Sequence, residues 1–176
     1  MGPELPVRLL QENHTNAPLT VIGDADLLLE RARMLGLELS VSRDRLMGPG
    51  MAAEVEQVPL RVPSIPGCLD QRNVDYVIEM LRHAANGCME GIYAGLVSGP
   101  VQKSVIREAG HRFSGHTEFL AELSRSKTAV MMLVRGGLRV ALATIHVPLV
   151  DVPSALTADL LERVLRVIDN DLKIRF

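Results

Sequence analysis

The chain has 176 residues, 47% of them apolar, with a mean hydropathy of +0.17, so it can fill a hydrophobic core and is not disordered throughout. Its 19 basic and 21 acidic residues are interspersed and it has no Trp, two Tyr and three Phe, which argues against nucleic-acid binding. Its apolar runs are too short to cross a bilayer and its start does not resemble a signal peptide, so we expect a cytoplasmic protein with no membrane partner.

The first part of the chain predicts a strand followed by a helix. Residues 19–23 form a short β-rich run that ends in glycine. Asp24 can cap a helix through Leu35, and Gly36 can end it.

The next stretch carries weaker signals. A second short strand is expected at residues 37–41. Residues 42–66 hold several Gly and Pro residues, which predicts a loop around one possible strand at residues 58–60.

The middle of the chain predicts an amphipathic helix and then a turn suited to an anion. Apolar residues recur at helical spacing across residues 69–89, which places His83 on the solvent side. Residues 94–97 are expected to form a strand that runs through Ser-Gly-Pro at 98–100 into a short helix at 101–109. A strand, a glycine turn and a helix N-terminus would together make a natural anion site.

The last part predicts a β-hairpin and a terminal helix. Residues 128–134 and 138–144 flank Arg-Gly-Gly at 135–137, a turn composition typical of hairpins. Thr157 can cap a helix whose apolar stripe continues to Leu172. Alternating strands and helices with a hairpin indicate an α/β fold with a mixed sheet.

Two histidines stand out as possible site residues, whereas His14, His83 and His111 lie at uninformative positions. His116 follows a glycine and precedes Thr117, a setting equally suited to a binding site or to a helix cap. His146 follows the second hairpin strand, where a structural histidine competes with a metal ligand.

Lys103 could contact a phosphate beside the Gly-Pro turn, although a surface lysine in the first turn of a helix explains it equally well. The sequence contains no P-loop, no GxGxxG after a strand and no G-x-S-x-G motif. The residues alone therefore indicate an α/β protein with a possible small-anion site.

Three blocks resemble the 4-hydroxythreonine-4-phosphate dehydrogenase family: residues 96–103 (LVSGPVQK), 113–119 (FSGHTEF) and 130–149. The resemblance implies a layered fold like that of isocitrate and isopropylmalate dehydrogenases, here truncated. It implies an incomplete first domain at residues 1–112, lacking its first strand, and the beginning of a second domain at 113–176.

By the same resemblance, His116 and Thr117 fall on positions that bind the phosphorylated substrate, and His146 falls on the first of three histidines that hold a divalent metal such as zinc, magnesium or cobalt. The family oxidises 4-phosphohydroxy-L-threonine with NAD, or alternatively NADP, to a 3-keto acid. That acid loses carbon dioxide to give an amino-ketone phosphate in pyridoxal phosphate biosynthesis.

Family members are nearly twice as long, and the two other metal histidines lie in the part that this chain lacks. We therefore expect the chain to need a complementing carboxyl-terminal half, or a homodimer of the family type, for activity. Two alternatives remain open: a related dehydrogenase of another four-carbon acid phosphate such as phosphothreonate, and a non-catalytic remnant or interaction fragment.

Overall fold

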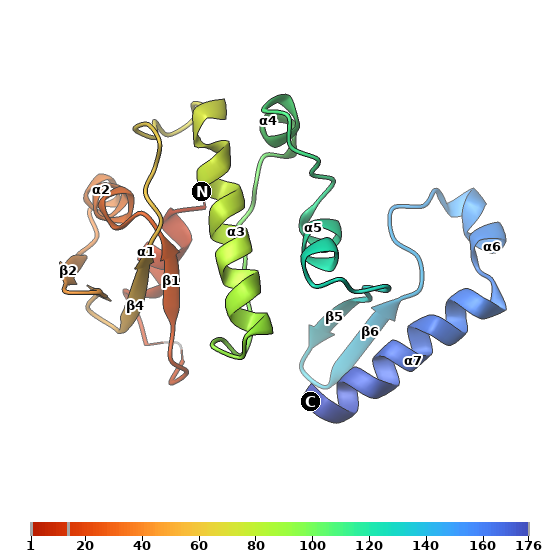
Figure 1. Ribbon diagram of the computed structural model, residues 1–176. Helices are drawn as coiled ribbons and strands as arrows, with labels where there is room; N and C mark the ends of the chain where they lie inside the picture. The colour runs from red at the N-terminus through yellow and green to blue at the C-terminus, as the bar shows by residue number, and fades with distance from the viewer. Residues whose placement is uncertain (1, 14, 176) are drawn as a thin grey trace. The chain divides into compact units, whose positions relative to one another are not determined.

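A computed structural model describes residues 2–13 and 15–175, which form two compact units (Figure 1). The first unit is Met1–His116 and the second is Thr117–Phe176. His14 lies outside the described residues. Whether the second unit is the beginning of a second domain stays a prediction.

The first unit is built on a four-stranded sheet in the order β1-β4-β3-β2. Its strands are β1 (Thr20–Gly23), β2 (Ser40–Ser42), β3 (Arg45–Met47) and β4 (Ala52–Gln57). β1 pairs with β4 in parallel, whereas β4 with β3 and β3 with β2 are antiparallel. The predicted α/β fold with a mixed sheet is confirmed.

The structure corrects the prediction for residues 37–66. The expected loop contains both β3 and β4, and the expected strand at 58–60 is wrong because β4 ends at Gln57. The strand expected at 37–41 begins only at Ser40. The position of β4 depends on pairing with two neighbouring strands: Glu54 pairs with Arg45 of β3 on one side and, on the other, with Thr20 of β1, which is distant in sequence.

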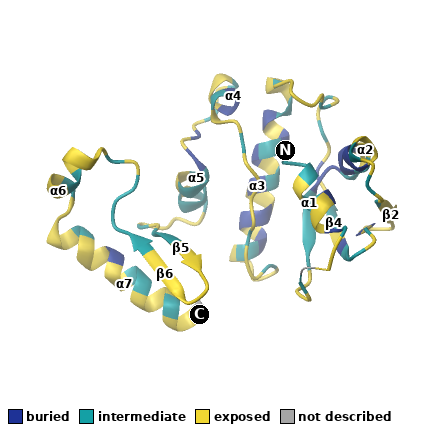
Figure 2. Cartoon of the chain, turned by 180° about the vertical axis from the view of Figure 1, so that it is seen from behind, coloured by how far each residue is buried: buried dark blue, intermediate teal, exposed yellow. Residues whose placement is uncertain are grey.

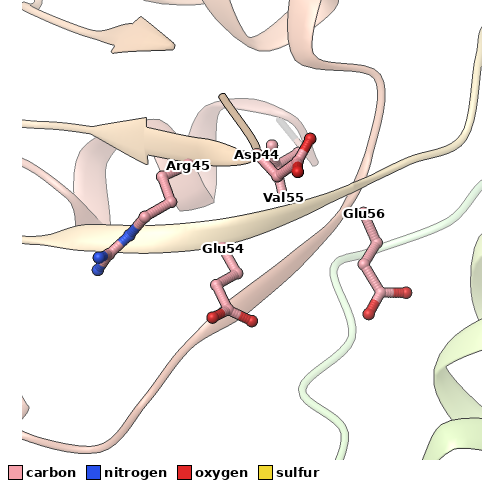
Figure 3. Close-up of a pocket in the computed structure, with 5 residues that line it drawn as sticks. All are labelled: Asp44, Arg45, Glu54, Val55 and Glu56. Carbon is pink, nitrogen blue, oxygen red and sulfur yellow. The ribbon is translucent and has the colours of Figure 1, made fainter. Parts of the chain in front are cut away.

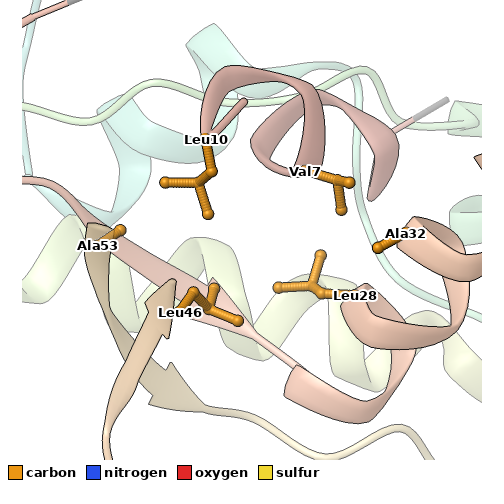
Figure 4. Packing of buried hydrophobic residues seen from close by; sticks show 6 residues of the cluster. All are labelled: Val7, Leu10, Leu28, Ala32, Leu46 and Ala53. Atoms are coloured by element: carbon orange, nitrogen blue, oxygen red, sulfur yellow. The ribbon is translucent and has the colours of Figure 1, made fainter. Parts of the chain in front are cut away.

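Helices α1 (Glu4–Leu9) and α2 (Ala25–Leu35) cover one face of this sheet. Figure 4 shows the apolar side chains that meet between these helices and strands β3 and β4. The buried members of this core are Val7, Leu10, Leu28, Ala32, Leu46 and Ala53. The sequence analysis did not predict α1.

Both predicted ends of α2 are confirmed. The Asp24 side chain accepts a hydrogen bond of 2.9 Å from the Leu27 N–H, as an N-cap does. Gly36 has a φ of 66°, a left-handed conformation that glycine adopts without steric cost and that ends the helix.

Helix α3 (Val74–Met89), preceded by the 3-10 turn η1 (Gln71–Asn73), covers the other face of the sheet beside β1. Tyr76 of this helix packs with Leu27 and Val58, and its hydroxyl accepts a 3.3 Å hydrogen bond from the Asp24 N–H. His83 is exposed, as the helical spacing predicted.

The second unit contains helix, hairpin and helix in sequence. The second unit begins at the second residue of α5 (His116–Leu123). It continues with strands β5 (Met131–Arg135) and β6 (Leu138–Leu142), the 3-10 turn η2 (Leu149–Asp151), and helices α6 (Val152–Ala155) and α7 (Ala158–Arg175). The antiparallel pairing of β5 with β6 confirms the predicted hairpin. The Thr157 hydroxyl accepts a 3.1 Å hydrogen bond from the Leu160 N–H and so confirms the predicted helix cap.

Much of this second unit is exposed to solvent (Figure 2), and its exposed residues include several large apolar side chains. Leu133 and Leu138 of the hairpin are 59% and 66% exposed, and Leu165 of α7 is 62% exposed. A two-stranded hairpin is only marginally stable without further packing. Among the described residues, no helix is both long enough and apolar enough to span a bilayer.

Candidate functional site

The strand predicted before the Gly-Pro turn does not form, and the anion site expected there stays a prediction. Residues 94–97 are not a strand, and Val97 is 98% exposed. A strand needs a neighbour to pair its backbone groups, and local composition cannot supply one. Helix α4 (Lys103–Glu108) begins at Lys103, whose side chain is exposed, and it is only six residues long.

His116 and Thr117, which are consecutive in the sequence, occupy the first two positions of α5. The His116 ring meets the buried ring of Phe113 edge to face, with 5.8 Å between centroids and 80° between planes. Its Nε2 is buried and has no hydrogen-bond partner in the described part of the chain. Such an atom in a native protein calls for a partner.

His146 lies in the second unit, in the segment between β6 and η2. Its side chain is exposed and its φ is 56°, a left-handed conformation that is unusual for a residue other than glycine. Because β6 ends at Leu142, His146 does not directly follow the strand as the sequence analysis expected. Strained backbone of this kind often accompanies functional side chains.

The described residues do not by themselves fit a catalytic metal ion. No group of three His, Cys, Asp or Glu side chains with suitable geometry occurs among residues 2–13 and 15–175. His146 could supply one nitrogen ligand, but a catalytic zinc site, for example, uses three protein ligands. The predicted roles of Lys103, His116, Thr117 and His146 therefore stay predictions.

Replacing His146 by glycine is expected to leave the free energy of unfolding unchanged or to raise it by about 1 kcal/mol, because glycine adopts positive φ without steric cost. Denaturant unfolding would measure this. Arg125, with φ 52°, is exposed in the same unit, and the Arg125→Gly variant is a matched control. A loss of more than about 1 kcal/mol in His146→Gly alone would mean that the imidazole has a structural role.

The sequence analysis missed a polar cluster on the α3 face of the sheet. A cavity of about 400 Å³ is lined by Asp44, Arg45, Glu54, Val55 and Glu56 (Figure 3). Glu54 and Glu56 extend from the same face of β4, and Glu56 accepts hydrogen bonds from His83 of α3 and from Tyr93. Sequence signals could not reveal it, because β4 was not predicted and its partners are 27 and 37 residues away.

Similarity to known proteins covers the whole chain. Residues 15–176 match the family described as "Pyridoxal phosphate biosynthetic protein PdxA". The 4-hydroxythreonine-4-phosphate dehydrogenase of Pseudomonas putida is 44% identical over 182 residues, and that of Azoarcus sp. is 47% identical over 179 residues. Each alignment covers 100% of this chain but only 55% and 54% of the relative.

The fold is also similar to that of a solved structure with the same name as these relatives. The crystal structure of 4-hydroxythreonine-4-phosphate dehydrogenase from Klebsiella pneumoniae matches with a TM-score of 0.84 and 28% identity. That match covers 97% of this chain and 54% of the Klebsiella chain, so the chain spans about half the length of the relatives it matches. Because the family model matches residues 15–176, the chain belongs to the PdxA family of pyridoxal phosphate biosynthetic proteins.

Proposed function

We propose that this chain is the amino-terminal, substrate-binding half of a cytoplasmic 4-hydroxythreonine-4-phosphate dehydrogenase. The complete enzyme would oxidise 4-phosphohydroxy-L-threonine by transferring hydride to NAD, or alternatively NADP, and the resulting 3-keto acid would lose carbon dioxide. His116 and Thr117 would bind the phosphorylated substrate, and Lys103 is a further candidate for the phosphate. His146 would contribute one ligand to a divalent metal whose other ligands come from outside this chain.

The observation that carries the proposal is the buried ring nitrogen of His116 that has no hydrogen-bond partner among the described residues. The residue stands beside Thr117 at the start of α5. The first N–H groups of a helix lack partners within the helix and favour anions. An imidazole N–H, a threonine hydroxyl and these backbone N–H groups can all donate hydrogen bonds, as recognition of a phosphate monoester requires.

The exposed apolar side chains of the second unit favour a second function, which is binding to another polypeptide. The unit's exposed hairpin and α7 side chains, Leu133, Leu138 and Leu165 among them, form the kind of apolar surface that marks a contact with another polypeptide. The occupant could be the complementing carboxyl-terminal half, or a full-length relative in a family-type dimer. In the second case the chain would be a non-catalytic interaction fragment.

The test is NAD reduction with 4-phosphohydroxy-L-threonine and a divalent metal. The purified chain is assayed alone and then mixed with the separately expressed remainder of the Pseudomonas putida relative. We expect activity only in the mixture. Activity of the chain alone would contradict the need for a second half, and an inactive mixture whose two parts associate would favour the interaction fragment. Phosphothreonate, assayed in parallel, tests the related dehydrogenase.

In an active mixture, His116→Ala is expected to lower kcat/KM by about 10- to 100-fold, the loss of one hydrogen bond to a charged group. The matched control is His111→Ala. His111 lies in the same unit and pairs with the exposed Asp75 at 3.0 Å. Equal effects of the two substitutions would contradict a binding role for His116.

A further inference from the structure

We propose that the first unit has one open strand position, between β1 and residues 94–97, and that an extended apolar strand of another polypeptide binds there. The proposal concerns an interaction surface and does not depend on the dehydrogenase activity. Two unpaired backbone segments carry it: the free edge of β1 and the segment that follows α3.

Strand β1 has a free edge. Among residues 2–13 and 15–175, it pairs on one side only, because the sheet has the order β1-β4-β3-β2. The carbonyls of Leu19 and Gly23 accept hydrogen bonds of 2.9 and 3.0 Å from N–H groups on the β4 side. Successive residues of a strand direct their backbone groups to opposite edges, so those of Thr20 and Ile22 point to the free edge. An added strand can bond to these groups.

Residues 94–102 return along α3. They start beside the end of this helix, where the Ile92 N–H donates a 2.8 Å hydrogen bond to the Gly87 carbonyl. They lead through α4 to His111, which pairs at 3.0 Å with Asp75 in the first turn of α3. Figure 1 shows this connection beside α3. The segment therefore runs opposite to α3, from the end of the helix to its start.

The direction of this segment is also that of β1. Helix α3 contacts β1 and begins at the end of that strand, where the Tyr76 hydroxyl accepts a 3.3 Å hydrogen bond from the Asp24 N–H. The helix runs back along β1, and residues 94–97 run forward again, as the second strand of a β-α-β unit does. Because β4 already lies between β1 and β3, the free edge on this side of the sheet is that of β1.

The segment does not pair with that edge. Residues 94–97 are not a strand, and Val97 and Ile92 beside them are 98% and 66% exposed. The far end of the segment instead meets the start of α1, because a Cβ on Gly99 would lie 3.7 Å from the Cα of Gly2. One strand placed between β1 and residues 94–97 would pair with both.

Helix α1 gives the direction of the added strand. It starts beside Gly99, and after its other end the Leu10 carbonyl accepts hydrogen bonds of 3.1 and 3.3 Å from Gly50 and Met51, just before β4 begins. The helix therefore runs from the carboxyl ends of the parallel strands to their amino ends. In α/β folds such a helix follows a parallel strand that ends where the helix starts. The strand that fits runs parallel to β1 and ends beside Gly2.

The added strand must be apolar on both faces. Helices α1 and α2 cover one face of the sheet and α3 covers the other, and strands covered on both faces are continuous apolar runs. Its two neighbours, β1 and residues 94–97, contain no charged residue. The alignment with the Pseudomonas putida relative covers only 55% of that relative. An apolar segment from the part of such a polypeptide outside the match is the occupant that the proposal names.

The test is amide hydrogen exchange of the purified chain with and without a synthetic peptide. The peptide repeats residues 19–23, Leu-Thr-Val-Ile-Gly, and carries added lysines at its amino end for solubility. At millimolar peptide we expect exchange at Thr20 and Ile22 to slow by about tenfold, the size of one new hydrogen bond. Val21 and Gly23, whose backbone groups face β4, should keep their exchange rates.

Two controls make the test specific. A peptide with proline at its third position lacks an N–H that the pairing needs and should slow neither amide. In the chain, Val97→Asp places a charge beside the added strand and should weaken peptide binding by about tenfold. Its side chain is 98% exposed, so the stability of the chain should not change. Ile65→Asp, at a 64% exposed position in the loop after β4, is the matched variant and should bind as the wild type does.

Three results would overturn the proposal. The first is unchanged exchange at Thr20 and Ile22 with millimolar peptide. The second is slowing at β2, the other edge of this sheet, or at the β5–β6 hairpin in place of β1. The third is exchange at Thr20 and Ile22 that is already as slow as at Val21 without peptide, because the position would then be closed. No readout uses substrate, NAD or metal, so an inactive enzyme mixture would not affect the outcome.

Discussion

Replacing Leu46 by alanine is expected to lower the free energy of unfolding by about 2–5 kcal/mol, the range for removing a fully buried leucine. Leu46 is 0% exposed and lies in β3 between Val41 and Ala53 of the neighbouring strands. Its side chain points into the core that also contains residues of α1 and α2 (Figure 4). Because protein interiors are closely packed and rigid, the surrounding residues would not completely fill the cavity that alanine leaves. Denaturant unfolding of the chain would measure the change.

The matched control for this substitution is Met47→Ala. Met47 is the next residue of β3, points to the opposite face and is 42% exposed, so its loss should be below about 1 kcal/mol. The pair also tests the correction to the sequence analysis, because residues in a surface loop would give two small effects. Similar losses for both variants would contradict the place of Leu46 in the core.

Replacing Asp24 by alanine is expected to lower the free energy of unfolding by about 2–4 kcal/mol, because one carboxylate accepts hydrogen bonds from two backbone N–H groups, one buried and one partly buried. Oδ1 accepts from the Leu27 N–H and caps α2, while Oδ2 accepts a 2.8 Å hydrogen bond from the Leu60 N–H. Alanine would leave both N–H groups without that partner. Thermal or denaturant unfolding monitored by circular dichroism would show the loss.

Two further variants separate the roles of Asp24. Asp24→Asn keeps one acceptor for the helix cap but places an amide near the Leu60 N–H, so about half of the loss should remain. Asp26→Ala removes an exposed carboxylate from the same first turn and should change the free energy of unfolding by about 0.5 kcal/mol or less. A loss in Asp26→Ala as large as in Asp24→Ala would refute the explanation.

The elements predicted correctly from the sequence are those with local signals. Asp24 and Gly36 bound α2, Gly136 lies in the hairpin turn with φ 56°, and Thr157 caps α7. Each signal acts within a few residues, through a side chain that bonds its own helix or a backbone angle that glycine favours. These elements could therefore be predicted without knowledge of the tertiary packing.

The elements predicted wrongly depend on distant partners. β3 has three residues, and β4 alternates small and acidic residues, Ala53-Glu54-Val55-Glu56, so neither has strong strand composition. Pairing with β1, more than thirty residues earlier, makes β4 a strand. Residues 94–97 show the converse, since their strand-like composition without a pairing partner does not give a strand.

The candidate site was predicted mostly through family resemblance, not through residue spacing. The structure adds the Phe113 contact and the buried Nε2 of His116, which no local sequence pattern indicates. It also adds Glu56, which depends on β4 and could not be found before that strand was known. Contacts between residues 27 or more positions apart need the fold itself.

The exposed hairpin and α7 bear on how long such a chain would persist in a cell. Leu133, Leu138 and Leu165 present to solvent the kind of apolar surface that chaperones and quality-control proteases recognise in incompletely folded proteins. A polypeptide that covered these residues would also shield the chain from degradation. Its steady-state abundance would then follow the supply of that partner more closely than its own rate of synthesis.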